Sequence, residues 1–204
     1  MDKHKFQGKY RIESTRLKDY DYSRNGAYFV TICTKNSMHL FGSIVDQKLI
    51  PNRQAEVVTE CWLDLPAHYT NCVLDKFIIM PDHVHGIIII DNEIAETGLK
   101  LNNTIVETGF KPDKVVVETG FKPVSTAGRV AKLYPLSEII RGFKTFSARR
   151  INEYQNTRGK AFWQSRFYDH IIRNREELKR IRQYIIENPL KWELEKNNHE
   201  NLFM

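Results

Sequence analysis

Apolar residues fall into short blocks that predict four β-strands. β-branched and aromatic residues are dense at 27–34, which is typical of a strand. Two apolar runs, 73–80 and 83–90, flank a Pro-Asp pair, so we expect two extended segments joined by a tight turn. Residues 167–172 show the strand pattern again near the end of the chain. A weaker, separate hairpin is expected at 41–50.

Apolar residues at helical spacing predict three helices. The first begins at Pro51 or Asn52 and runs to about Tyr69. Ser137 is the expected cap of the second helix, which continues to about Tyr154. The buried face of this second helix is expected to consist of Ile139, Ile140, Phe143, Phe146 and Ile151.

The last predicted helix opens with a capping box, in which Asn174 is the cap and Glu177 follows three residues later. A proline disfavours the helical conformation of the residue before it, so Pro189 is expected to end the helix near Glu187. The apolar stripe of this helix consists of Leu178, Ile181 and Ile185.

The order of these elements, leaving out the hairpin, is βαββαβ followed by one further helix. This order is typical of the ferredoxin-like α+β fold, in which helices cover an antiparallel sheet and the first and third strands are central. The strand at 83–90 is therefore expected in the middle of the sheet. A chain of 204 residues suits a single domain, and we expect residues 1–204 to form one.

Residues 91–128 interrupt this pattern with a repeated motif. The sequence Glu-Thr-Gly-Phe-Lys-Pro occurs at 107–112 and again at 118–123, and a degenerate copy stands at 96–100. Glycine and proline in the copies exclude a long helix, and three short copies are too few for a solenoid. We expect a largely disordered insertion without a role in the chemistry.

The charge of the chain is uneven. The net charge is +6, and residues 129–191 hold fifteen Lys and Arg against six Asp and Glu. Such a basic block suggests a polyanionic partner, most simply nucleic acid, although the same residues could merely solvate helices.

The remaining composition indicates a reducing compartment. Three cysteines form no C-x-x-C pair, which argues against a cysteine-based zinc site. No apolar run approaches the ~20 residues of a membrane span, and no secretory signal is visible, so the expected location is the cytoplasm.

His83 and His85 open the strand at 83–90. Alternate residues of a strand share a face, so both imidazoles project to the same side, among isoleucines. Buried imidazoles need polar partners, and a divalent metal ion is one candidate. Solvated or hydrogen-bonded edge histidines are the alternative.

Tyr184 and Asn188 lie four residues apart in the last helix, on one side of it. A tyrosine hydroxyl can attack a phosphodiester that a divalent cation has polarised, and an amide oxygen can complete a site with two histidines. The alternative is an ordinary core tyrosine. Tyr168 competes for the nucleophile's role, but the neighbouring Asp169 opposes phenolate formation, and His170 is a further possible ligand.

Several stretches of the chain resemble one known family. Met80-Pro81-Asp82-His83-Val84-His85 resembles the His-hydrophobic-His (HUH) motif of the IS200-like, single-tyrosine transposases. Gly142-Phe143-Lys144, the segment 162–173 and the segment 181–189 resemble the REP-associated tyrosine transposases. The similarity extends from about residue 28 to 192, without the repeats.

This resemblance implies that Tyr184 is the nucleophile and that His83 and His85 bind a divalent metal, Mg²⁺ or Mn²⁺. It implies a third ligand four residues after the tyrosine, where this chain has Asn188. The implied substrate is single-stranded or hairpin DNA, cleaved through a 5′-phosphotyrosine link and rejoined to a second strand. Residues expected to contact this DNA are Arg141, Lys144, Arg149, Arg150, Arg166 and, by base stacking or else as a core residue, Trp163.

Two other functions fit parts of the sequence. A domesticated DNA-binding protein would keep hairpin recognition without cleavage, and a histidine-dependent phosphoesterase would cut without a covalent intermediate. The second usually needs two histidine motifs, whereas one is present. A nucleoid-associated bacterial protein, either a monomer or a homodimer, is expected in the transposase interpretation.

Overall fold

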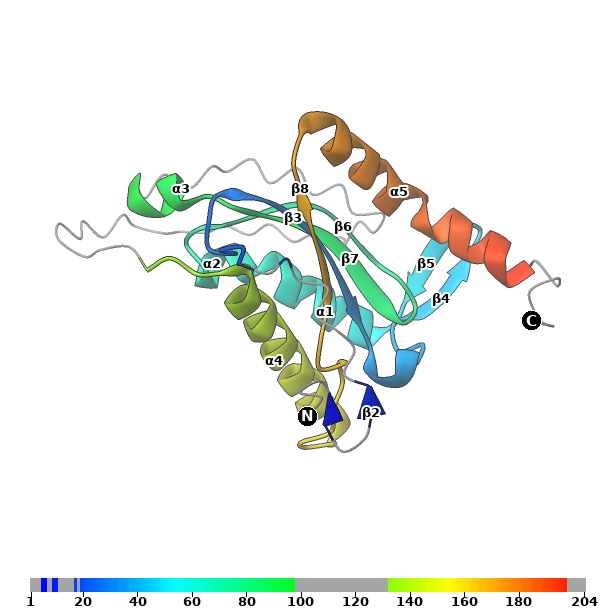
Figure 1. Cartoon of the computed structure of the whole chain (residues 1–204). Coiled ribbons are helices and arrows are strands. Elements are labelled where there is room, and N and C mark those ends of the chain that lie inside the picture. Colours follow the sequence, from blue (N-terminus) through cyan, green and yellow to red (C-terminus); the bar gives the residue numbers. More distant parts are fainter. Residues whose placement is uncertain (1–4, 7–8, 11–16, 18, 98–131, 198–204) are drawn as a thin grey trace.

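A four-stranded antiparallel sheet forms the centre of the molecule (Figure 1). The structure is a computed structural model that describes residues 5–6, 9–10, 17, 19–97 and 132–197. The strand order is β6-β7-β3-β8, and every neighbouring pair is antiparallel. The strands are β3 (Gly26–Cys33), β6 (Cys72–Ile79), β7 (His83–Ile90) and β8 (Tyr168–Ile172). The ferredoxin-like order is therefore confirmed, with β3 and β7 in the centre.

Helices cover both faces of this sheet. The helices α1 (Arg53–Leu63), α2 (Leu65–His68) and α4 (Leu136–Gln155) lie on one face, and α5 (Arg175–Asn197) crosses the other (Figure 1). Successive side chains of the central strands point to opposite faces of the sheet and so enter two different hydrophobic cores. On β7, Val84 and Ile88 pack toward α1 and α4, whereas Ile87 and Ile89 belong to the smaller core beneath α5.

The larger core depends on two close approaches at glycines. A Cβ on Gly86 of β7 would lie 2.3 Å from the Trp62 ring, and a Cβ on Gly142 of α4 would lie 1.7 Å from the Tyr69 hydroxyl oxygen. Phe143, next to the second glycine, packs edge to face with Trp62. These contacts hold α1 and α4 against the sheet.

Short elements surround this framework. The expected hairpin is present as β4 (Gly42–Val45) and β5 (Lys48–Pro51), and its turn residues Asp46 and Gln47 have φ angles of 48° and 61°. A two-stranded ribbon of β1 (Lys5–Phe6) and β2 (Lys9–Tyr10) and a 3₁₀ turn, η1 (Lys35–Ser37), complete the described elements together with α3 (Asn92–Thr97).

Three local predictions on the helices were wrong. The first helix breaks at Asp64, and a separate short helix begins at Leu65 with Pro66 in its first turn, where proline is tolerated. Ser137 lies inside α4, whose N-cap position is Pro135. Phe146 is 49% exposed and stacks on His68 instead of entering the core.

The predicted end of the last helix was also wrong, since α5 runs through Pro189 to Asn197. A proline within a helix costs one backbone hydrogen bond and clashes with the preceding turn. Packing beyond the proline offsets this cost: Trp192 contacts His83 and His39, with ring centroids 5.8 and 5.4 Å apart.

The first residues of the expected insertion are ordered. Its first residues form α3, in which Asp91 accepts hydrogen bonds from the N–H groups of Glu93 and Ile94, so disorder from residue 91 was wrong. The repeat copies at 107–112 and 118–123 lie outside the described residues. None of the described helices is long and apolar enough to span a membrane.

Candidate active site

His83 and His85 face each other at the start of β7, on the side of the sheet that α5 covers. Their Nε2 atoms lie 3.0 Å apart. The Nδ1 atom of each ring has its own partner: Asp82 Oδ1 lies 2.5 Å from that of His83, and Thr31 Oγ1 lies 2.9 Å from that of His85. These outer contacts turn both Nε2 atoms toward the same point.

His85 is the more enclosed of the two histidines, with 5% of its surface exposed. Phe29 stacks on its ring at a centroid distance of 5.3 Å. Burial, followed by the neighbouring His83, lowers the pKa of His85 to about 3 and outweighs the opposing effect of Asp82. His85 is therefore neutral near pH 7, which is the state in which imidazole binds metals.

Tyr184 reaches this histidine pair from α5. Its hydroxyl oxygen lies 3.4 Å from His85 Nε2, and its ring packs edge to face on Phe29. The side chain stays 39% exposed, so a substrate can approach the hydroxyl. The ammonium of Lys191 lies 5.1 Å from the centroid of the Tyr184 ring. Strand and helix thus meet at one point, as the sequence predicted.

On α5, Asn188 lies between two residues that each contact one of the histidines. Tyr184, one turn earlier, contacts His85, and Trp192, one turn later, contacts His83. Residues at this spacing share one face of a helix, so Asn188 faces the histidine pair and is 7% exposed. Continuation of the helix through Pro189 preserves this spacing.

The residues present fit a divalent metal ion with nitrogen and oxygen ligands. With metal–nitrogen bonds of about 2.1 Å, two ligands at right angles would be about 3 Å apart, which matches the separation of the two Nε2 atoms. Within the described part of the chain, no group of three or more His, Cys, Asp or Glu side chains is arranged to hold a metal ion. Asn188 is not one of these residue types, and its role as a third ligand of Mg²⁺ or Mn²⁺ through its amide oxygen stays a prediction.

The two competing residues have other surroundings. Tyr168 pairs with Thr31 across β8 and β3, and Thr31 pairs with His85 on the other side, so Tyr168 lies two strands from the histidine. His170 Nε2 lies 2.8 Å from a carboxylate oxygen of Glu177, at the start of α5. The structure thus brings Tyr184, and neither of these two residues, to the histidine pair.

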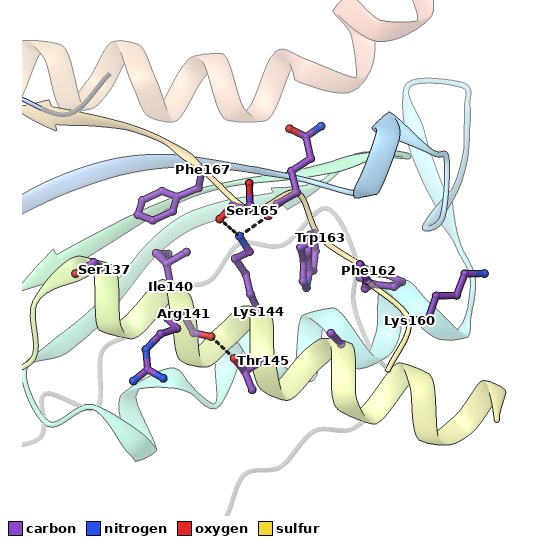
Figure 2. A pocket seen from close by; sticks show the side chains of 13 residues that line it. Ser137, Ile140, Arg141, Lys144, Thr145, Lys160, Phe162, Trp163, Ser165 and Phe167 are labelled. Carbon is purple, nitrogen blue, oxygen red and sulfur yellow. Dashed lines mark hydrogen bonds between the residues drawn. The ribbon is translucent and has the colours of Figure 1, made fainter. Parts of the chain in front are cut away.

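The predicted DNA-contacting residues lie on the opposite face of the sheet, on α4 and the segment that leads into β8. A pocket of about 480 Å³ separates these two parts, lined by residues that include Arg141, Lys144 and Trp163 (Figure 2). Lys144 Nζ donates to the carbonyl oxygens of Gln164 at 2.5 Å and Ser165 at 3.1 Å. Burial lowers the pKa of Lys144. This lysine holds the segment in place.

Trp163 packs in the core, 6% exposed, and its Nε1 donates to Ser147 Oγ at 3.0 Å. Base stacking on this residue, one of the two alternatives, is therefore excluded by its burial, and the core alternative is correct.

The arginines remain at the surface. Arg150 forms an ion pair with Glu60 of α1 at 2.9 Å, Arg149 pairs with Glu153 at 2.9 Å, and Arg141 lies 3.7 Å from Glu138. Arg166 is exposed beside the pocket. Their contact with DNA stays a prediction.

Sequence reasoning missed three residues of the site. Asp82 could have been predicted from the sequence, because it directly precedes the first histidine and a carboxylate there can orient a metal ligand. No sequence pattern indicated Thr31 or Trp192. Their contacts depend on the β3–β7 register and on the continuation of the helix beyond Pro189.

Fold and site together define an α+β protein in which a helical tyrosine meets a pair of histidines on a central strand. The family described as "Transposase IS200 like" matches residues 129–188, which include Tyr184 and Asn188. An uncharacterized protein of Haemophilus influenzae is 33% identical over 190 residues, covering 91% of this chain and 92% of that protein. The chain belongs to the IS200-like transposase family, and its general role is that of a DNA transposase.

A solved structure of lower similarity is described as a REP-associated tyrosine transposase bound to a REP hairpin. It shares 15% identity with this chain, with a TM-score of 0.49, and the alignment covers 89% of this chain and 74% of the other.

Proposed function

We propose that this transposase cleaves and rejoins single-stranded or hairpin DNA through a 5′-phosphotyrosine intermediate on Tyr184. The observation that carries the proposal is the approach of the Tyr184 hydroxyl to 3.4 Å from His85 Nε2, beside the second imidazole. Two imidazoles, a buried amide and an exposed phenol are the kinds of group that such chemistry uses.

Each residue of the site has a distinct task in the proposed reaction. The Tyr184 oxygen attacks the scissile phosphorus, the bond to the 3′ oxygen breaks, and the departing strand leaves with a 3′-hydroxyl. A second 3′-hydroxyl reverses this step and joins the DNA to a new strand. A Mg²⁺ or Mn²⁺ ion held by His83, His85 and Asn188 would polarise the phosphate when bound.

Phe29 supports the reacting groups from below. Its ring touches both His85 and Tyr184, at centroid distances of 5.3 and 5.9 Å. The Phe29 ring occupies the inner side of the site, and Tyr184 stays 39% exposed to solvent.

The test is a cleavage assay with labelled hairpin DNA carrying a single-stranded tail, in the presence of Mn²⁺. The wild-type protein should form an adduct that survives denaturation with detergent. Tyr184→Phe and His85→Ala should form none, and Tyr168→Phe should retain it. Cleavage by Tyr184→Phe would indicate a metal-dependent phosphoesterase, and tight binding without any adduct in the wild type would indicate a DNA-binding protein.

A further inference from the structure

Polar contacts tie helix α5 to both edge strands of the sheet. At its start, Glu177 accepts a hydrogen bond from the N–H of Arg173 and lies 2.8 Å from His170 of β8. One turn and a half later, Arg182 makes two contacts with Asp75 of β6, of which Nε to Oδ1 measures 2.9 Å. The helix therefore crosses the sheet diagonally and has polar contacts with the edge strand at each side, β8 and β6 (Figure 1).

Apolar contacts between these ties do not fix the helix along its axis. Leu178, Ile181 and Ile185 pack on a surface that includes Ile87 and Ile89. Contacts of this kind are not directional, so an aliphatic stripe over an aliphatic sheet tolerates small slides and rotations. A bidentate arginine–carboxylate pair, in contrast, demands one geometry.

The carboxylate of this pair is set firmly in the sheet. Asp75 lies at an irregularity of β6, where the pairing with β7 shifts between Leu74 and Phe77, and its side chain is 11% exposed. Its Oδ1 also accepts a hydrogen bond from the N–H of Lys76 at 2.6 Å. Burial raises the pKa of Asp75, but the contacts with Arg182 and Lys76 outweigh this effect and hold that pKa below its ordinary value.

We infer that Asp75 and Arg182 are positioning residues for Tyr184, which lies two residues beyond the arginine. The pair sets the rotation and axial position of α5 that bring the Tyr184 hydroxyl to His85. This inference rests on the proposed function. The arginine acts through the helix: among the described residues, both of its side-chain hydrogen bonds are to Asp75 and neither is to a residue of the site.

A mutant cycle tests the pair. Asp75→Asn and Arg182→Gln should each slow adduct formation at saturating DNA about 10- to 100-fold, because small misplacements of reacting groups have effects of this size. The affinity for DNA should stay within about twofold of the wild type. The double variant should be no slower than the slower single variant, since both changes break one contact. Arg182→Lys keeps the positive charge but cannot form the bidentate contact, so its rate should lie between those of the wild type and Arg182→Gln.

Glu60→Gln provides the matched control, because it breaks an ion pair of similar length between α1 and α4 on the other face. It should leave the rate at saturating DNA unchanged. The inference would be overturned if the rate losses of the two single variants multiplied in the double variant. It would also be overturned if Glu60→Gln lost as much rate as Asp75→Asn or Arg182→Gln.

A measurement without DNA separates this inference from the proposed function. Protein labelled with 3-fluorotyrosine gives a ¹⁹F signal for Tyr184, which is assigned by its loss in Tyr184→Phe. Asp75→Asn and Arg182→Gln should move this signal in the same way, and Glu60→Gln should not move it. An unchanged Tyr184 signal in both variants would overturn the positioning role. A wild-type protein that forms no adduct would overturn the proposed function, whatever the ¹⁹F result.

Discussion

His83 and His85 converge because residues outside the pair hold their rings. Asp82 binds Nδ1 of the first ring, and Thr31, on the neighbouring strand β3, binds Nδ1 of the second. The Asp82 carboxylate can only accept, so Nδ1 of His83 donates in this contact, whereas the Thr31 hydroxyl can donate to or accept from Nδ1 of His85. Both contacts orient the rings so that their Nε2 atoms point into the site. If the proposed metal binds here, Asp82 and Thr31 orient its two histidine ligands.

This arrangement predicts the effect of Asp82→Asn. An amide orients His83 less well than a carboxylate and does not increase its basicity, so affinity for Mn²⁺ should fall by about 10- to 100-fold. Isothermal titration of the DNA-free protein with MnCl₂ measures this affinity. Asp64→Asn, which removes a carboxylate that contacts exposed His68, should bind Mn²⁺ like the wild type. Unchanged affinity in Asp82→Asn would contradict the assigned role.

Helix α4 uses its Gly142-Phe143-Lys144 stretch for packing. The glycine admits the Tyr69 hydroxyl, the phenylalanine joins the ring cluster with Trp62 and Trp163, and the lysine binds carbonyl oxygens of the segment before β8. A stretch that resembles a family motif is therefore structural here and places the segment that carries Trp163.

Gly142→Ala should destabilise the protein, against the usual trend in helices. Alanine in place of glycine favours an exposed helix by up to about 1 kcal/mol. Here the new Cβ would lie 1.7 Å from the Tyr69 oxygen, and overpacking of a core costs about 1–3 kcal/mol. Urea denaturation should show the loss, and Tyr69→Phe in the same chain should restore part of it. A variant as stable as the wild type would contradict this packing.

Elements were predicted well where local pattern decides them and poorly where packing does. The period of two in strands placed both histidines on one face, and Asn174 caps α5 as expected. The end of α5 was wrong because the contacts of Trp192 with His83 and His39 outweigh the local preference of Pro189. Residues distant in sequence supply such contacts, so no local pattern can reveal them.

At the scale of the whole molecule, the two sets of predicted functional residues lie on opposite faces of one sheet. Tyr184 on α5 and the histidines on β7 lie on one face, whereas Arg141 and Arg149 are on α4, which covers the other face. The βαββαβ order allowed this topology to be predicted, because it makes the histidine strand central. The sequence could not show on which face each basic residue lies, since helix orientation depends on tertiary packing.

Binding of DNA by the α4 face predicts a particular salt dependence. Each phosphate contact releases counterions, so affinity should fall steeply with rising salt. Arg141→Ala and Arg149→Ala should each reduce the slope of log affinity against log salt by about one. Fluorescence anisotropy with a labelled hairpin measures this slope. Arg53→Ala on α1 serves as the comparison and should leave it unchanged. The same slope in the wild type, Arg141→Ala, Arg149→Ala and Arg53→Ala would exclude these phosphate contacts.

The central claim is that Tyr184 becomes joined to DNA, and peptide mapping of the adduct tests it most directly. After reaction with hairpin DNA and Mn²⁺, nuclease and trypsin digestion should yield the peptide Gln183–Lys191 carrying a nucleotide through its 5′ phosphate. The peptide Phe167–Arg173, which contains Tyr168, should remain unmodified. A nucleotide on Tyr168, or cleaved DNA without any modified peptide, would contradict the account.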